Sequence, residues 1–304
     1  MHMAILTVGI PCYNEAATIG KVISDFRRVF PDAKILVIDN NSTDATGDIA
    51  KHYGADVLVE GRQGKGYAVQ SLFREANSEW LLMVDGDDTY PAEEAEKMFC
   101  MARSERCDTV VGWRTCDSGG AFIPTHTWAN RLLSFGIEKI MGAPCGDLFS
   151  GLRLFHRRFY KNIPLLATGF EVETELALQT IDKGFSQKNI RIMYRSRPEG
   201  SVSKLHTFSD GSRVLVLMAR IIKDFKPLAF FGFLGLMLMA FSLLAGAFPV
   251  WEYFHYRYVF RVPLAILATG FAMLSSICLA CGILLDTTVR HRKEEFLLRM
   301  RNMP

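Results

Sequence analysis

Two long stretches without a charged residue most constrain what this chain can fold into. Residues 227–250 and 262–285 are each 24 residues long, and neither contains Asp, Glu, Lys or Arg. At a rise of about 1.5 Å per residue, a helix of either length crosses a hydrocarbon core of about 30 Å. One such run could be a buried core helix, but two in tandem, separated only by residues 251–261, predict a transmembrane hairpin.

The residues that flank these runs predict its orientation. The connector is aromatic, which is typical of a membrane–water interface, and holds Trp251, Tyr253, Tyr256 and Tyr258. Basic residues are sparse there but dense on the other side, at Arg213, Arg220, Lys223, Lys226, Arg290, Arg292, Lys293, Arg299 and Arg301. Because Lys and Arg favour the cytoplasmic side, we expect an integral membrane protein with two spans and with both termini in the cytoplasm.

Residues 209–225 carry apolar side chains at helical spacing with basic residues elsewhere around the helix. This pattern favours a helix in the headgroup layer that leads into the first span, and the alternative is an amphipathic helix packed on a globular domain. The expected organisation is a catalytic domain over residues 1–205, an interfacial helix over 206–226, the hairpin over 227–285 and a basic cytoplasmic tail over 286–304.

Residues 1–205 alternate between strand-like and helical patterns. The predicted strands are residues 4–10, 34–39, 55–59, 80–85 and 109–112, and helical patterns lie between them. This alternation predicts an α/β domain with a mostly parallel sheet. Asn14, Asp39 and Asp85 follow three of these strands, at the edge where open α/β sheets bind ligands.

Composition excludes several classes of protein. A formal net charge of only +3 argues against a dedicated nucleic-acid-binding protein. The seven cysteines are odd in number and match no disulfide framework, so we expect reduced thiols. The first ten residues enter a strand-like pattern directly, with no feature of a signal peptide.

The strongest chemical signal is Asp85-Gly86-Asp87, where the chain leaves an apolar strand. Two carboxylates one residue apart can hold Mg²⁺ or Mn²⁺, because these ions prefer oxygen ligands and often complete their shells with substrate phosphates. A solvated acidic turn is the other interpretation of this tripeptide alone. Its context decides between them.

That context comprises four further segments: IPCYNE over residues 10–15, VIDNNSTD over 37–44, GKG over 64–66 and VVGWR over 110–114. Together with the DGD turn, they closely resemble the family 2 glycosyltransferases of GT-A fold. More narrowly, they resemble the membrane subgroup of dolichyl- and polyprenyl-phosphate hexose synthases. The resemblance covers residues 4 to about 205, and a two-span tail also occurs in some members.

The resemblance implies a role for each matching residue. A nucleotide-sugar would be bound by Pro11, Tyr13, Asn14, Glu15, Asp39, Gly64, Lys65, Asp85, Gly86 and Arg114. Asp39 matches the carboxylate that recognises the base, and Asp85 and Asp87 match the metal-binding pair. Thr89 stands where these synthases often carry Gln, which puts a third protein ligand for the metal in doubt.

The acceptor phosphate would be bound, by the same resemblance, in two later segments. DLFSGLRLF contributes Ser150 and Arg153, and RPEGSVSK contributes Arg197, Ser203 and Lys204, with Arg131 as an additional candidate. Arginine suits this task because its planar fork binds phosphate oxygens bidentately. The expected catalytic residues are Asp87, Arg153, Arg197 and Lys204.

The resulting hypothesis is an inverting transfer of a hexose from a nucleotide-sugar to polyprenyl phosphate at the cytoplasmic membrane face. UDP-glucose or another UDP-hexose is the favoured donor, and GDP-mannose is the alternative. The phosphate acceptor is already a nucleophile, so no essential general base is expected; Asp147 and Glu173 are the candidates if the acceptor is a hydroxyl.

Three other functions stay open at this point. A processive polysaccharide synthase would normally carry a Q-x-x-R-W segment, which this chain lacks. A transferase acting on a glycan or protein hydroxyl, and a non-catalytic membrane scaffold that binds sugar nucleotides, are the other two. A homo-oligomer is plausible for a two-span anchor, and the sequence does not fix it.

Overall fold

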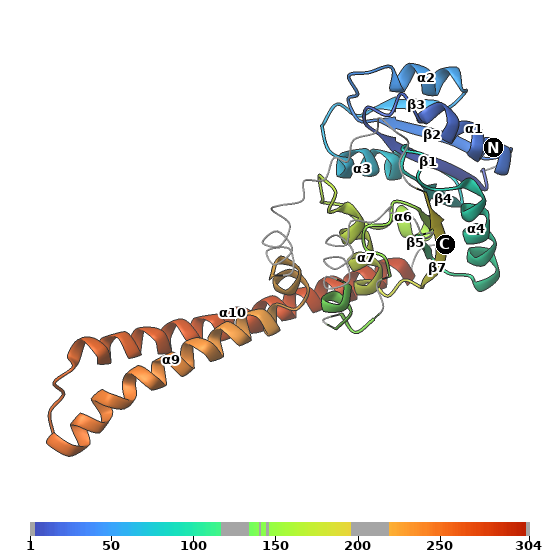
Figure 1. Ribbon diagram of the computed structural model, residues 1–304. Coiled ribbons are helices and arrows are strands. Elements are labelled where there is room, and N and C mark those ends of the chain that lie inside the picture. Colours follow the sequence, from blue (N-terminus) through green and yellow to red (C-terminus); the bar gives the residue numbers. More distant parts are fainter. Residues whose placement is uncertain (1–3, 117–133, 140, 144–145, 196–218, 302–304) are drawn as a thin grey trace. The chain divides into compact units, whose positions relative to one another are not determined.

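The computed structural model describes residues 4–116, 134–139, 141–143, 146–195 and 219–301. The chain divides into two compact units, residues 1–208 and 209–304. The first unit is built on a seven-stranded sheet, and the second contains two long apolar helices (Figure 1).

The sheet is mostly parallel. Its strands are β1 (Leu6–Cys12), β2 (Lys34–Asp39), β3 (Asp56–Val59), β4 (Trp80–Met83), β5 (Thr109–Cys116), β6 (Arg153–His156) and β7 (Gln187–Tyr194). They lie in the order β3-β2-β1-β4-β6-β5-β7. Only β6 runs antiparallel to its neighbours, β4 and β5. The α/β class and the mostly parallel sheet predicted from the sequence are confirmed.

Helices cover both faces of this sheet. In chain order, the helices of this unit include α1 (Ile19–Val29), α2 (Thr46–His52), α3 (Lys65–Glu75), α4 (Ala92–Glu105), α6 (Arg157–Tyr160) and α7 (Val172–Asp182). Helices α1 and α4 share a buried apolar cluster with alternate residues of the central strands. On the other face, aromatic side chains of α3, β6 and α6 pack edge to face or stacked, namely Phe73, Phe155, Phe159 and Tyr160.

The second unit is a helical hairpin of α9 (Pro227–Tyr256) and α10 (Val262–Arg301), drawn side by side in Figure 1. Both helices are long and apolar enough to be candidate membrane spans. Helix α9 continues past the apolar run, so the connector shortens to residues 257–261. The carboxylate of Glu252 accepts hydrogen bonds from the backbone N–H groups of Phe260 (3.0 Å) and Arg261 (3.1 Å), which closes that turn.

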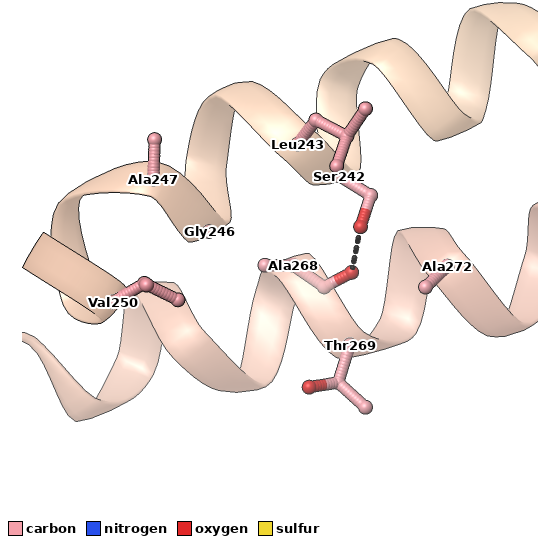
Figure 2. Close-up of a pocket in the computed structure, with 8 residues that line it drawn as sticks. All are labelled: Ser242, Leu243, Gly246, Ala247, Val250, Ala268, Thr269 and Ala272. Atoms are coloured by element: carbon pink, nitrogen blue, oxygen red, sulfur yellow. Dashed lines mark hydrogen bonds between the residues drawn. The ribbon is translucent and has the colours of Figure 1, made fainter.

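Small residues form the seam between the two helices. They recur every seven residues on each helix, as Gly235, Ser242 and Pro249 on α9 and Ala268, Ser275 and Gly282 on α10. Two hydroxyls cross the seam: Ser242 Oγ donates to Ala268 O (2.8 Å), and Ser275 Oγ donates to Gly235 O (2.7 Å). Figure 2 shows the first of these bonds in a shallow groove that small residues leave between the helices.

Of the predicted interfacial helix, only its last residues fall in the part of the chain that the structure describes. Residues 219–225 are helical and lead to the start of α9. The remainder of the expected segment, and its placement in a headgroup layer, stay predictions.

Candidate active site

The residues singled out by the sequence gather where β1, β2 and β4 end and β6 begins. In the sheet register, Cys12 of β1 lies beside Asp39 of β2, and Met83 of β4 lies beside Arg153 of β6. Because β6 runs antiparallel, its first residue reaches the same edge as the last residues of its parallel neighbours. The topology therefore brings four separate loops to one edge of the sheet.

The loops after β1 and β2 are joined by hydrogen bonds. Asn14 Oδ1 accepts from the backbone N–H of Thr43 (2.8 Å), and the backbone N–H of Glu15 donates to Thr46 Oγ1 (2.8 Å). Asn14 adopts a left-handed backbone with φ 50°, which asparagine tolerates better than most residues. Pro11 lies within β1 opposite Ile38, just before this joined pair of loops. Hydrogen bonds thus hold the first two predicted nucleotide-binding loops in one fixed arrangement.

Asp39 and Asn40 hold the loop after β2 in place and connect it to the next loop. Asp39 is buried, and its Oδ1 accepts from the backbone N–H of Ser42 (3.0 Å). Asn40 Oδ1 accepts from the backbone N–H of Gly64 (2.7 Å), while its Nδ2 donates to the carbonyl of Arg62 (2.6 Å). Asn40 was not singled out from the sequence, although its amide ties the β2 loop to the predicted Gly64-Lys65 loop.

The two carboxylates of the DGD turn have different surroundings. Asp85 is partly exposed, and its Oδ1 accepts from Lys65 Nζ (2.6 Å). Its Oδ2 lies against Gly151, where an added Cβ would stand 2.0 Å away, so a larger residue there would displace the Asp85 carboxylate. Asp87 is buried, and its Oδ1 accepts from Thr89 Oγ1 (2.6 Å). Thr89 therefore orients Asp87.

These carboxylates suit a cation that takes most of its ligands from elsewhere. Among the described residues, no group of three or more His, Cys, Asp or Glu side chains is placed to hold a metal. Asp85 and Asp87 offer hard oxygen donors, and Mg²⁺ or Mn²⁺ bound through one or two carboxylates fills its shell with phosphate oxygens and water. The donor set fits such an ion and does not fit a site built from protein ligands alone.

Lys65 is the centre of a buried ion cluster. Its ammonium contacts Asp85 Oδ1 (2.6 Å) and Glu173 Oε1 (2.5 Å). Burial opposes the charge, but Asp85 and Glu173 together raise the pKa of Lys65 above its ordinary value. Burial raises the pKa of Glu173, while Lys65 acts against that shift. From the sequence, Glu173 was expected only as a reserve general base, because a phosphate acceptor needs no base.

Arg114 lies in the same region but is already paired. Its Nε and Nη2 donate to the two carboxylate oxygens of Asp147 at 2.6 and 2.9 Å. Burial opposes its charge, but Tyr90 and Asp147 raise the pKa of Arg114 overall. The pair fixes the loop before β6 against β5. A contact between Arg114 and the donor phosphates stays a prediction.

Arg153 has surroundings that differ from the phosphate-facing position expected for it. The side chain is 1% exposed, and its guanidinium donates to the carbonyls of Ser150 (3.0 Å), Asp147 (3.3 Å) and Leu148 (2.8 Å). These contacts shape the loop that ends in Ser150, also fully buried, and Gly151. Arg153 thus positions this loop in the described structure, and the physical reason is that three carbonyls turn inward and need donors.

Four predicted residues lie outside the described residues: Arg131, Arg197, Ser203 and Lys204. Tyr13 and Gly86 do lie at the described edge. Tyr13 is partly buried next to the first loop, and the carbonyl of Gly86 accepts from Thr18 Oγ1 (2.6 Å). The structure therefore gathers the predicted donor-binding residues at one edge of the sheet. Ser150 and Arg153 of the predicted acceptor set lie at the same edge.

Comparison with known families gives a match over the same region. Residues 7–163, just over half of the 304 residues, match the family described as Glycosyl transferase family 2. Two relatives from Haloferax volcanii extend the match. Glycosyltransferase AglJ is 32% identical over 94% of this chain and 94% of its own length. A dolichyl-phosphate hexose transferase is 30% identical over 69% of this chain and 90% of its own length.

Solved structures match the fold at lower sequence identity. A glucosyl-3-phosphoglycerate synthase of Mycobacterium tuberculosis, solved with phosphoglyceric acid, superposes with a TM-score of 0.58 and 21% identity, over 72% of this chain and 79% of that one. Another structure of the same enzyme, solved with Mn²⁺ and UDP-glucose, gives a TM-score of 0.56, also at 21% identity, over 72% and 78% of the chains. These matches confirm a GT-A-like fold.

Proposed function

This chain belongs to glycosyl transferase family 2, and from that membership and its site we propose that it transfers a hexose from a nucleotide-sugar to polyprenyl phosphate. That it is a hexosyltransferase enzyme follows from the family and from its named relatives. The acceptor, the donor and the inverting course of the reaction are the parts that we propose.

One observation carries the donor half of the proposal. The carboxylate turn at Asp85 and Asp87 lies beside Lys65 and beside Gly151, at the sheet edge that also holds the loops of Asn14 and Asp39. A diphosphate needs a cation and a fixed positive side chain near it, and a nucleoside needs polar loops on one side. The described edge offers two carboxylates that would hold a cation, the Lys65 ammonium and the polar loops, and a structural neighbour was solved with Mn²⁺ and UDP-glucose.

Asp85 and Asp87 are the residues that would hold Mg²⁺ or Mn²⁺, which neutralises charge on the departing nucleotide. The protein's own groups supply positioning. Thr89 keeps the Asp87 carboxylate oriented, and the absence of a side chain at Gly151 leaves room for the Asp85 carboxylate. Lys65 adds a buried ammonium next to Asp85, in surroundings where electrostatic stabilisation is stronger than in water.

The acceptor half rests on chemistry and on the relatives. A phosphate monoester is largely a dianion at neutral pH, because its second pKa is about 6, and so it needs no general base. Attack of its oxygen on the anomeric carbon opposite the leaving nucleotide gives inversion. Arg197, Ser203 and Lys204 are proposed to gather the acceptor phosphate, as the family resemblance implies. A relative named as a dolichyl-phosphate hexose transferase supports this class of acceptor.

The hairpin supports a lipid acceptor independently. Helices α9 and α10 expose large apolar side chains and pack through small ones, which is the arrangement that suits lipid rather than water. We propose that they span the membrane with the catalytic unit and both termini in the cytoplasm. A polyprenyl chain is insoluble in water, so an anchored enzyme meets its phosphate at the headgroup plane.

The test is transfer of label from nucleotide-sugar to lipid. The full-length chain in detergent micelles, with Mn²⁺ and a short polyprenyl phosphate, is incubated with radiolabelled UDP-glucose or GDP-mannose. Label in the organic phase that mild acid releases as free sugar supports the proposal, and the more active donor separates UDP-hexose from GDP-mannose. Label found only in a water-soluble glycan, protein or polymer would replace it with one of the hydroxyl-acceptor functions.

A further inference from the structure

Glu173 is the most buried member of the Lys65 cluster. Its side chain is 4% exposed, Oε1 contacts Lys65 Nζ, and Oε2 has no hydrogen-bond partner among the residues that the structure describes. A buried carboxylate without enough partners is costly, so its persistence calls for a reason. Lys65 is the group that links it to the carboxylate turn, since the same ammonium also contacts Asp85.

The geometry around Lys65 is tightly built. An added Cβ at Gly64 would lie 2.2 Å from the carbonyl oxygen of Thr168, and one at Gly66 would lie 2.1 Å from that of Ala167. The backbone N–H of Gly66 also donates to Thr168 O (3.0 Å). The two glycines thus let the start of α3 press against the segment before α7, which sets Lys65 beside Glu173.

The first turn of α7 divides its glutamates between two tasks. Residues 171 and 175 are four apart and share a helix face, whereas residue 173 points to the opposite face. Glu175 accepts from the backbone N–H of Ala167 (2.8 Å), and Glu171 accepts from that of Gly169 (3.0 Å). Both therefore secure the segment before α7. Glu173 alone turns toward Lys65.

A charge conflict follows if Asp85 binds a cation. Asp85 Oδ1 is already occupied by the Lys65 ammonium, and two cations cannot share one carboxylate without repulsion. Glu173 is the second anion within reach of the same ammonium. We propose that Glu173 is a positioning residue that retains Lys65 when Asp85 binds the divalent cation, so that the ammonium leaves Asp85 and faces the donor diphosphate.

This inference rests on the proposed cation site, and it predicts a coupling that a merely structural carboxylate would not produce. Without Glu173, Asp85 is the one carboxylate left of the two that Lys65 contacts in the described structure, so Lys65 competes with the cation for it. Without Lys65, no ammonium competes with the cation for Asp85. The charge of Glu173 then has no ammonium to draw away from Asp85. The effect of changing Glu173 on cation affinity should therefore depend on whether Lys65 is present.

The experiment measures Mn²⁺ binding to the full-length protein in detergent by the loss of the free Mn²⁺ EPR signal, with UDP present and no acceptor. The variants are E173Q, K65Q and the double variant, with E171Q as the matched control one helical face away. Because no transfer is required, a failure of the proposed acceptor would not affect the measurement. Sugar transfer to polyprenyl phosphate is assayed separately.

We expect E173Q to weaken Mn²⁺ binding about tenfold, which corresponds to about 1.4 kcal/mol. K65Q removes both a competitor for Asp85 and a positive group near the diphosphate, so it serves as the reference for the cycle, and adding E173Q to K65Q should cause little further change. E171Q should bind like the unchanged protein. If E173Q does not fold, E173D, which keeps the charge on a shorter side chain, should give a smaller loss that K65Q again removes.

Three outcomes would overturn the inference. One is equal weakening by E173Q with and without Lys65, which would give Glu173 a structural role. Another is normal Mn²⁺ affinity in E173Q. The last is an absence of Mn²⁺ binding in the unchanged protein with UDP, in which case Lys65 has no cation to yield to.

Discussion

The catalytic unit and the hairpin bury opposite kinds of side chain. In the catalytic unit, large apolar residues such as Phe26, Leu82 and Phe155 are buried. In the hairpin, Phe233 and Leu244 are 72% and 68% exposed, and the buried seam is made of glycine, alanine, serine and proline. This inversion is the pattern expected of a hairpin that faces lipid, because lipid gives large apolar side chains no reason to pack inward, and it agrees with α9 and α10 being candidate membrane spans.

The two units also differ in how they use polar groups. The edge of the sheet concentrates charges, with Lys65 held between Asp85 and Glu173, and Arg114 paired with Asp147. The seam of the hairpin uses neutral hydroxyls that donate to carbonyls across it. Sugar transfer should therefore depend on the side chains of the first unit, and access to the lipid acceptor should depend on the second. Variants of the two units should differ in which of these measurements they change.

The largest expected effect comes from Asp87. D87N keeps an oxygen that can accept the Thr89 hydrogen bond and removes the charge that a cation needs. We expect transfer to fall by about 100-fold to 1,000-fold, the range for loss of one charge-stabilising group, with little change in thermal stability. Initial rates with radiolabelled donor measure it.

Asp88 provides the matched control. It follows directly, has a left-handed backbone that asparagine also adopts, and pairs with two exposed basic side chains, Lys21 (2.7 Å) and Arg195 (3.7 Å). D88N makes the same chemical change one residue away and should alter transfer less than about threefold, because exposed ion pairs contribute little. Equal loss in both variants would remove the special role of Asp87.

Removing the hairpin should have the next largest effect. A chain ending at residue 226 keeps the catalytic unit but loses the proposed anchor. We expect activity on a long-chain polyprenyl phosphate in vesicles to fall on the order of 100-fold, as effective concentration at the surface is lost. UDP binding, measured by calorimetry with Mn²⁺, should not change. Equal losses in both measurements would mean that the hairpin serves folding instead.

The sequence predicted the features that depend on local pattern. The apolar runs over residues 34–39 and 80–85 predicted β2 with its observed bounds and β4 with two residues too many at its end. The two long stretches without charged residues predicted the two helices of the hairpin. Strands β6 and β7 were missed; β6 pairs with β4 and β5, which come from distant sequence, and β7 pairs with β5. The place of β6 in mid-sheet is set by tertiary pairing that no local pattern encodes.

The site was predictable in its composition and not in its contacts. The DGD turn and the loops around Asn14 and Asp39 carry a family signature that is visible in sequence. Glu173 is buried because two glycines at the start of α3 let the segment before α7 pack closely against that helix. Arg153 is buried because it donates hydrogen bonds to three carbonyls that face inward. The seven-residue spacing of small residues in the hairpin was readable, and it is the signal that would have predicted the seam.

A smaller effect is expected from enlarging the seam of the hairpin. An added Cβ at Gly235 would lie 3.0 Å from Leu279, whereas one at Gly232 would meet nothing within 4 Å. G235L should lower the unfolding free energy of the hairpin by about 1–3 kcal/mol, as overpacking does, and G232L should not. Thermal unfolding in detergent, followed by accessibility of Cys278 and Cys281 to a thiol reagent, distinguishes them. Equal unfolding free energies for G235L and G232L would contradict close packing of the two helices at Gly235.

The smallest effect tests whether the hydroxyls of the seam matter at all. Ser275 Oγ donates across the seam to Gly235 O, whereas Ser276 Oγ donates to Ala272 O of its own helix (3.0 Å). S275A should cost about 0.6 kcal/mol, the average for a hydrogen bond between membrane helices, and S276A should cost less because its bond does not join two helices. Both changes remove the same atom from adjacent residues, so their difference in unfolding free energy isolates the bond across the seam. A larger cost for S276A would mean that the bond from Ser275 across the seam adds nothing to the packing of α9 and α10.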